Sequence, residues 1–167
     1  MTSTTKVAKR VVRGARRRGF TIAVAESLTG GRVASAIVAV PRASTVLRLG
    51  VVAYAAEMKR RVLKVDGGLL DKHGSVHPKV ALQMAEGVRK LAAVGKDIAS
   101  MGVATTGVAG PDPTDGHAVG VVHIAVSYPG GSIQREFAFE GGRNTIREAA
   151  TLQALLLLEE ALGESQA

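Results

Sequence analysis

Apolar and polar positions follow two periods along the chain, one typical of helices and one typical of strands. Residues 5–18 place Val and Ala on one helical face and Lys and Arg on the other, and Gly19 ends this predicted helix. Residues 20–25 are apolar and β-branched over the length of a strand. Small and apolar residues then recur at helical spacing over residues 29–40, where Pro41 ends the pattern. This part of the chain predicts a helix, a strand and a second helix.

The same two periods continue to the end of the sequence. Residues 50–54 form an apolar run of strand length, and helical patterns follow over residues 57–64 and 67–74. Pro78 stands in the first turn of a longer helix, where the missing proline N–H costs no helical hydrogen bond. The remaining predicted elements are strands over residues 98–105, 119–126 and 133–139 and a last helix over about 144–162.

The order of these elements predicts the fold class. Helices and strands alternate first, and a strand pair joined by Pro129-Gly130-Gly131 follows near the end. We therefore expect a three-layer α/β/α domain with a mixed sheet whose later strands are partly antiparallel. Hydrophobic residues make up 46% of the sequence and aromatic residues only 3%, so the core must be built from Ala, Val, Leu and Ile. At 167 residues, the chain has single-domain size, with the basic helix 1–18 as part of the same domain as residues 19–167.

The net charge of +8 is located mainly at one end of the sequence. Residues 1–18 contain seven Lys or Arg and no Asp or Glu, so the remainder of the chain is close to neutral. No aromatic residues that would stack on bases interleave these arginines, and we expect no nucleic-acid partner. A solvated helix face explains the pattern, and binding to an anionic surface is the minor alternative.

Two absences narrow the class of protein further. The sequence contains no cysteine, which excludes disulfide scaffolds, thiolate zinc sites and cysteine nucleophiles. No apolar run approaches the roughly 20 residues that a membrane-spanning helix requires, and no apolar segment follows the basic residues as in a secretory signal. We expect a soluble cytoplasmic protein without a membrane partner.

Three predicted junctions between a strand and the following segment carry chemically capable residues. Ser27 follows the first strand, and at the start of a helix it would lie beside free backbone N–H groups that stabilise an oxyanion. Gly30 and Gly31 would let a ligand approach the backbone closely. A serine or threonine here is also explained as a helix cap, so Ser27 and Thr29 keep both interpretations at this point.

The second junction contains Tyr54 and Lys59. If Tyr54 ends a strand and Lys59 lies in the first turns of the next helix, both side chains can point at the strand end. A desolvated lysine has a lowered pKa and can accept a proton from a serine hydroxyl. The alternative is that Lys59 belongs to a solvated basic helix face. None of the four histidines forms a Ser-His-Asp pattern, which leaves Lys59 as the candidate base for a serine hydrolase.

The third junction is the glycine-punctuated loop of residues 105–111. After a buried strand, such a loop can wrap a ribose or phosphate with its backbone N–H groups. Asp112, Asp115 and His117 follow it, but their spacing matches no helical or EF-hand pattern, and turn residues of this kind commonly cap loops. We expect no metal site.

Four segments in one order resemble the CinA C-terminal domain family, and the resemblance extends from about Phe20 to the final helix. They are Ala25-Glu26-Ser27-Leu28-Thr29-Gly30-Gly31, Gly50-Val51-Val52-Ala53-Tyr54 with Lys59, His73-Gly74-Ser75-Val76, and Thr106-Gly107-Val108-Ala109-Gly110-Pro111. Several ungapped motifs in register are more specific than a single glycine loop. The same pattern is similar to that of stand-alone nicotinamide-nucleotide amidohydrolases of the PncC type.

The resemblance implies an α/β/α domain that deamidates nicotinamide mononucleotide to nicotinate mononucleotide and ammonia without a metal or other cofactor. The family's catalytic serine, tyrosine and lysine correspond to Ser27, Tyr54 and Lys59. Ser27 would attack the carboxamide carbonyl, Lys59 would act as the base, and Tyr54 would relay or stabilise the proton. We expect a pyridine mononucleotide as the partner and a homo-oligomer as the assembly.

The resemblance also implies substrate contacts in the glycine loops and near the last helix. Arg143, near the start of that helix, is a candidate phosphate ligand, and Arg147 is a weaker one. The complete set of expected substrate-binding residues is Glu26, Thr29, Gly30, Gly31, Thr105, Thr106, Gly107, Ala109, Gly110 and Arg143.

The sequence departs from the family pattern in two places. His117-Ala118-Val119-Gly120 stands where many members have a longer loop ending in Lys-Pro-Val-Gly, and Gly142 stands where the family usually has Asp. These departures leave the three catalytic candidates unchanged and bear on ligand affinity and specificity. A catalytically silent nucleotide-binding or regulatory module of the same fold is the alternative function. Any activity of the larger N-terminal domain found in many CinA proteins is not predicted.

Overall fold

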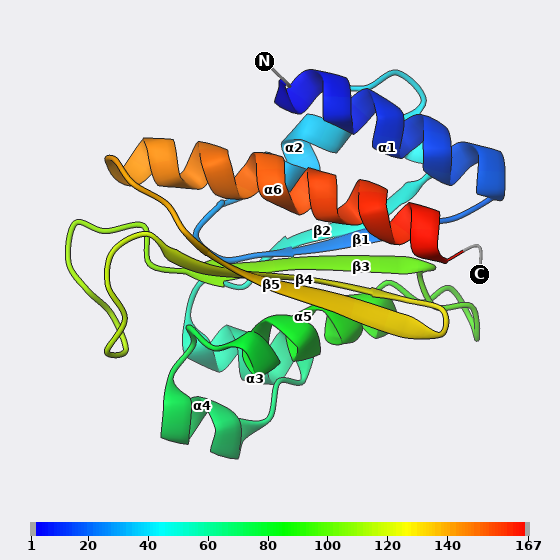
Figure 1. Cartoon of the computed structure of the whole chain (residues 1–167). Helices are drawn as coiled ribbons and strands as arrows, with labels where there is room; N and C mark the ends of the chain where they lie inside the picture. Colours follow the sequence, from blue (N-terminus) through cyan, green and yellow to red (C-terminus); the bar gives the residue numbers. More distant parts are fainter. Residues whose placement is uncertain (1–2, 166–167) are drawn as a thin grey trace.

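The computed structural model describes residues 3–165 and contains one five-stranded sheet in the order β2-β1-β3-β4-β5 (Figure 1). β1 pairs in parallel with β2 and β3, whereas β3–β4 and β4–β5 are antiparallel. The predicted mixed sheet with antiparallel later strands is confirmed. The strands are β1 Ile22–Glu26, β2 Leu47–Val52, β3 Met101–Gly107, β4 Val121–Tyr128 and β5 Gly131–Ala138.

Helices cover both faces of this sheet. α1, α2 and α6 lie on one face and α3, α4 and α5 on the other, which gives the predicted three layers (Figure 1). The helices are α1 Thr4–Arg18, α2 Arg32–Val38, α3 Ala56–Leu63, α4 Gly67–His73, α5 Pro78–Leu91 and α6 Arg143–Glu164, with a short 3₁₀ turn at Ala43–Thr45. None of the helices in the described part of the chain is long and apolar enough to cross a membrane.

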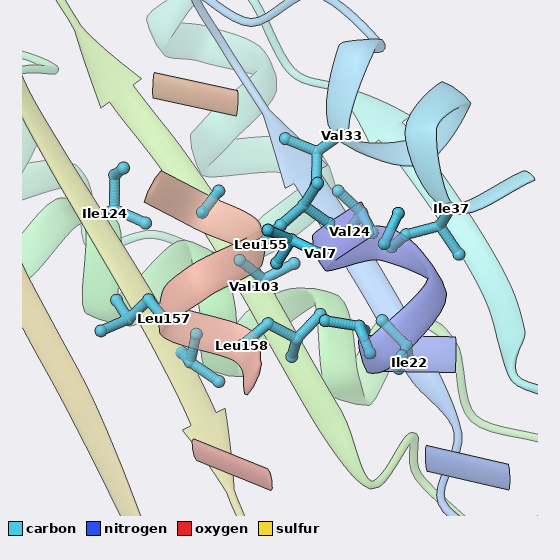
Figure 2. Close-up of a cluster of buried hydrophobic side chains, with 14 of the residues drawn as sticks. Val7, Ile22, Val24, Val33, Ile37, Val103, Ile124, Leu155, Leu157 and Leu158 are labelled. Carbon is cyan, nitrogen blue, oxygen red and sulfur yellow. The ribbon is translucent and has the colours of Figure 1, made fainter. Parts of the chain in front are cut away.

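The two sheet faces bury different side chains. On the α1/α6 face, Val24, Val103 and Ile124 of the strands meet Val7 of α1 and Leu155 of α6 (Figure 2). The opposite face presents alanines of β1, β3 and β4 to the buried side of α5. Because both faces are covered, every residue of β1 is buried, and Ile22–Ala25 form a continuous apolar run rather than an alternating one before the buried Glu26.

The basic first helix packs on this domain through its apolar stripe. Val7, Val11 and Ala15 of α1 are buried, and α1 lies along α6 (Figure 1). Its basic residues are exposed except for the half-buried Arg18, and Arg10 forms a bidentate ion pair with Glu159 at 2.6 and 2.9 Å. Gly19 ends the helix with a left-handed backbone at φ 64°, as predicted from the sequence.

Some element boundaries differ from the sequence prediction. α2 begins at Arg32 and not at residue 29, because Gly30 and Gly31 have φ values of +58° and +94° and form a turn before the helix. β2 begins three residues earlier than expected, at Leu47, and pairs with β1. β3 begins at Met101, after a turn in which Val94 and Asp97 exchange backbone hydrogen bonds.

Candidate active site

A buried lysine and a serine meet at the carboxyl end of β1. Lys59 Nζ lies 3.1 Å from Ser27 Oγ and also donates hydrogen bonds to the carbonyl oxygens of Ala53 at 2.9 Å and Tyr54 at 3.0 Å. The lysine side chain comes from the first turn of α3 and is only 1% exposed. Its three acceptors match the three N–H donors of an ammonium group. Within the described chain, no carboxylate lies at ion-pair distance from it.

The environment of Lys59 raises the share of neutral amine above that of a lysine in water. Burial lowers the pKa of Lys59 from 10.5 to about 8, and the negative charge of Asp115 acts in the opposite direction. About a tenth of the molecules then hold a neutral amine at pH 7. In that form Nζ can accept the hydroxyl proton of Ser27, which is the arrangement that a serine nucleophile and an amine base require.

Ser27 is fixed by its backbone rather than by its hydroxyl. Its N–H donates to the carbonyl oxygen of Thr105 at 3.1 Å, which joins the loop after β1 to β3. The residue is 8% exposed and faces a cavity. The hydroxyl therefore remains available to Lys59 on one side and to a ligand on the other.

The expected helix N-terminus at Ser27 is wrong, and so is the interpretation of Ser27 or Thr29 as a helix cap. The carboxylate of Glu26 accepts hydrogen bonds from the backbone N–H groups of Gly31, Val33 and Ala34 at 3.0, 3.1 and 2.9 Å. These are the amides at the start of α2, and a carboxylate satisfies them better than a hydroxyl because it also complements the helix dipole. The sequence pattern does not predict this cap, because Glu26 lies five residues before Gly31, the first residue whose amide donates to it.

Several residues expected to bind substrate lie behind the cavity wall. Glu26 caps α2, and the hydroxyls of Thr29 and Thr105 share a buried hydrogen bond of 2.8 Å. Arg147 donates to the carbonyl oxygens of Leu28 at 2.8 Å and Thr29 at 3.4 Å, so it holds the loop after Ser27. Gly30 and Gly31 form the turn described above and do not line the cavity.

The cavity itself has a volume of about 400 Å³ and contains the other candidates. Ser27 and Lys59 lie in its wall together with Tyr54 and Arg143. Arg143 donates to the Tyr54 hydroxyl at 2.9 Å and to the carbonyl oxygen of Gly110. The Tyr54 side chain is 58% exposed, and its hydroxyl bonds Arg143, whereas its carbonyl oxygen contacts Lys59. The glycine loop contributes Thr106, Gly107, Ala109 and Gly110 to the same wall.

One wall of the cavity was not predicted as a site from the sequence. Ser75 and Val76 line it, and the Ser75 backbone accepts a hydrogen bond from Thr106 Oγ1 at 2.7 Å and donates one to Asp115 at 2.7 Å. The Asp115-Gly116 dipeptide is the available signal, because Asp-Gly favours a tight hairpin turn. The sequence spacing alone indicates a turn residue or a metal ligand at Asp115, not a cavity wall.

A larger cavity of about 760 Å³ lies elsewhere, beside α5 and the β4–β5 hairpin. It contains the network of Glu86, Arg89 and Ser127, in which the serine hydroxyl donates to the Glu86 carboxylate at 2.6 Å. None of the residues predicted to be functional lines it. Ser27 and Lys59 both line the smaller cavity, which is therefore the candidate active site.

The four histidines form two close ring pairs, and His73, His77 and His117 line a hollow that Asp115 also borders. The ring centres of His73 and His77 are 4.6 Å apart, and those of His117 and His123 are 6.3 Å apart. Among the described residues, no group of three or more His, Cys, Asp or Glu side chains is arranged to hold a metal ion.

Comparison with known proteins decides the family. The family model of the CinA C-terminal domain matches residues 4–162. The chain belongs to the CinA C-terminal domain family. It is 47% identical over 146 residues to a CinA-like protein of Anaeromyxobacter sp. strain K, and this match covers 87% of the chain and 35% of the relative. A CinA-like protein of Frankia casuarinae is 43% identical over 145 residues, which cover 87% of the chain and 32% of the relative.

The chain thus spans about a third of the length of these curated CinA relatives. Solved structures match over nearly the whole of both chains. A CinA superfamily protein of Klebsiella pneumoniae has a TM-score of 0.90 at 31% identity, with 98% of this chain and 99% of that chain covered. A competence/damage inducible protein of Agrobacterium tumefaciens gives 0.89 at 32% identity, with 98% and 97% covered. The predicted fold is therefore the CinA fold.

Proposed function

We propose that the chain hydrolyses the carboxamide of nicotinamide mononucleotide to nicotinate mononucleotide and ammonia. The observation that carries this proposal is the 3.1 Å contact between Lys59 Nζ and Ser27 Oγ in the wall of a cavity. Membership of the CinA C-terminal family supports the substrate, because the family's nicotinamide-nucleotide amidohydrolases share the serine and lysine motifs that correspond to Ser27 and Lys59. The carboxamide is the group on which a serine nucleophile and an amine base can act.

The reaction has two stages in this proposal. In the first, Ser27 Oγ attacks the carboxamide carbon while its proton passes to the neutral amine of Lys59. Lys59 then gives this proton to the leaving nitrogen, the carbon–nitrogen bond breaks, and ammonia leaves an ester on Ser27. In the second stage, water attacks the ester and gives a proton to Lys59. The carbon–oxygen bond to Ser27 breaks, and Lys59 returns the proton to the serine oxygen.

We assign the other cavity residues to substrate binding. The Arg143 guanidinium lies in the cavity wall, where it can contact the phosphate of the nucleotide. Because Arg143 donates a hydrogen bond to the Tyr54 hydroxyl, that hydroxyl lies at the same end of the cavity as the guanidinium. The backbone of residues 106–110 would then contact the ribose and the carboxamide. The proton-relay role of Tyr54 rests on the family resemblance.

Purified protein incubated with nicotinamide mononucleotide and a metal chelator tests the proposal. We expect ammonia and nicotinate mononucleotide to form in equal amounts in the wild type, and Ser27→Ala and Lys59→Ala to lose at least a thousandfold in kcat/KM. Equal turnover in wild type and Ser27→Ala would contradict the mechanism. Binding of the nucleotide without any turnover would instead support the silent nucleotide-binding module.

A further inference from the structure

A tight turn carries Asp115 to the cavity. Thr114 and His117 exchange two backbone hydrogen bonds of 3.2 and 2.9 Å, and the two residues between them have positive φ values, 53° for Asp115 and 76° for Gly116. This is the backbone of a tight hairpin turn that Asp-Gly sequences favour. The turn fixes the direction of the Asp115 side chain, because both of its ends are hydrogen-bonded.

The Asp115 carboxylate is held by the chain segment that follows α4. It accepts the Ser75 N–H at 2.7 Å. A Cβ atom on the preceding Gly74 would meet Asp115 Cγ at 2.3 Å, and Gly74 has φ +72° and ψ −169°, a backbone conformation that is essentially restricted to glycine. The close approach of the two segments therefore requires glycine at position 74. The Ser75 carbonyl in turn accepts the Thr106 hydroxyl, so the carboxylate is connected to β3.

The charge of this carboxylate reaches the reactive amine. The charged groups that line the cavity are Lys59, Asp112, Asp115 and Arg143. Of these, Asp115 is the one whose negative charge raises the pKa of Lys59 against the effect of burial. On its other side, Asp115 borders a hollow lined by the charged or titratable residues Asp71, Lys72, His73, His77 and His117.

We propose that Asp115 is a specificity-determining residue: held against Ser75, its charge makes the cavity prefer a positively charged, N-substituted pyridine ring over a neutral one. This inference rests on the proposed function and names the feature of the substrate that the site recognises, which is the positive charge of the ring. A pyridine nitrogen that carries ribose is a cation, whereas the reduced ring is neutral. A fixed carboxylate in a partly enclosed cavity attracts the cation without needing to touch the reacting carbonyl.

A matched pair of ligands tests the preference without turnover. Nicotinamide mononucleotide and its reduced form have the same ribose, phosphate and carboxamide and differ by one hydride, which neutralises the ring and ends its aromaticity. Both are titrated calorimetrically at pH 8 into the Ser27→Ala protein and into Ser27→Ala combined with Asp115→Asn. Asparagine keeps an oxygen that accepts the Ser75 N–H and removes only the charge.

We expect the Ser27→Ala protein to bind the oxidised nucleotide more tightly, and Asp115→Asn to reduce that preference by about tenfold. Asp71→Asn, which neutralises a carboxylate of the neighbouring hollow, should leave the preference unchanged. An unchanged preference in Asp115→Asn would overturn the inference, as would failure of both nucleotides to bind. Selective binding together with absent turnover in the wild type would overturn the proposed reaction and leave this inference standing.

A second readout separates the charge from a structural role. In an otherwise wild-type protein, Asp115→Asn should move the rising limb of the pH profile of kcat/KM to lower pH, because Asp115 raises the pKa of Lys59. Asp71→Asn should not move it. An equal loss of kcat/KM at every pH, with the limb in place, would show that Asp115 only supports the wall and would contradict the proposal.

Discussion

Lys59 reaches Ser27 from the first turn of α3 and places its Nζ 3.1 Å from the serine Oγ. The lysine approaches across the end of β2, while the serine follows β1, the neighbouring strand in the sheet. Two carbonyl oxygens, those of Ala53 and Tyr54, hold Nζ at this position. A neutral or charged amine can use these acceptors, so the geometry of the pair does not depend on one protonation state.

The activity should follow the protonation of Lys59. In the proposed mechanism the neutral amine is the base, and burial lowers the pKa of Lys59 to about 8, so kcat/KM should rise with pH and level off above this value. Steady-state ammonia release between pH 6 and 10 measures the profile. A profile that is flat from pH 6 to 9 would contradict a lysine base with this pKa.

The unfolding free energy should also depend on pH through the titration of Lys59. The folded pKa of Lys59, about 8, lies below the unfolded value of 10.5, so the unfolded chain binds more protons between these values. Lys59 therefore destabilises the fold below pH 8, and this penalty is relieved as the pH rises towards 10.5. We expect the unfolding free energy of the wild type, relative to Lys59→Met, to increase by up to about 3 kcal/mol over this range.

Urea denaturation of both proteins at pH 7 and pH 10 measures that difference. Methionine has a similar length and does not titrate, so other groups contribute equally to the two curves. A constant difference between the two proteins would mean that Lys59 has an ordinary pKa in the fold.

Most of the architecture can be predicted from the sequence, because apolar periodicity reports which faces are buried. The basic helix ending at Gly19, the strand before Ser27 and the last helix were all predicted close to their observed positions. The turn at Gly30 and Gly31 is harder to predict, because small residues continue the helical pattern through it. The turn is created by the positive φ values of the two glycines. Periodicity carries no information on backbone φ.

Only part of the candidate site could be predicted from the sequence. Ser27 and Lys59 were identified by residue type and position, and the structure brings them together. The role of Glu26 was missed because its carboxylate reaches amides at 31, 33 and 34, contacts that only the folded turn creates. Ser75 and Asp115 were missed as a cavity wall because they are 40 positions apart and meet through a tight turn.

Glu26 should contribute to stability through α2. Its buried carboxylate accepts three backbone N–H groups at the start of this helix, and Glu26→Gln replaces one acceptor oxygen by an NH₂ donor facing the same amides. We expect a loss of about 1–3 kcal/mol in unfolding free energy, measured by urea denaturation. Glu57→Gln, an exposed residue in the first turn of α3, is the control and should change stability by less than about 0.5 kcal/mol. Equal effects of the two substitutions would contradict the capping role.

The two arginines of α6 should have separable effects. Arg143 lies in the cavity wall and contacts the Tyr54 hydroxyl, whereas Arg147 donates to the Leu28 and Thr29 carbonyls behind the wall. Arg143→Ala should raise KM for nicotinamide mononucleotide about tenfold or more by removing the proposed phosphate contact, with a much smaller effect on the riboside that lacks the phosphate. Arg147→Ala should instead lower the melting temperature, because it releases the loop that carries Ser27. If Arg143→Ala affected the nucleotide and the riboside equally, the phosphate would have to contact another part of the cavity, and Arg143 would act on Tyr54 alone.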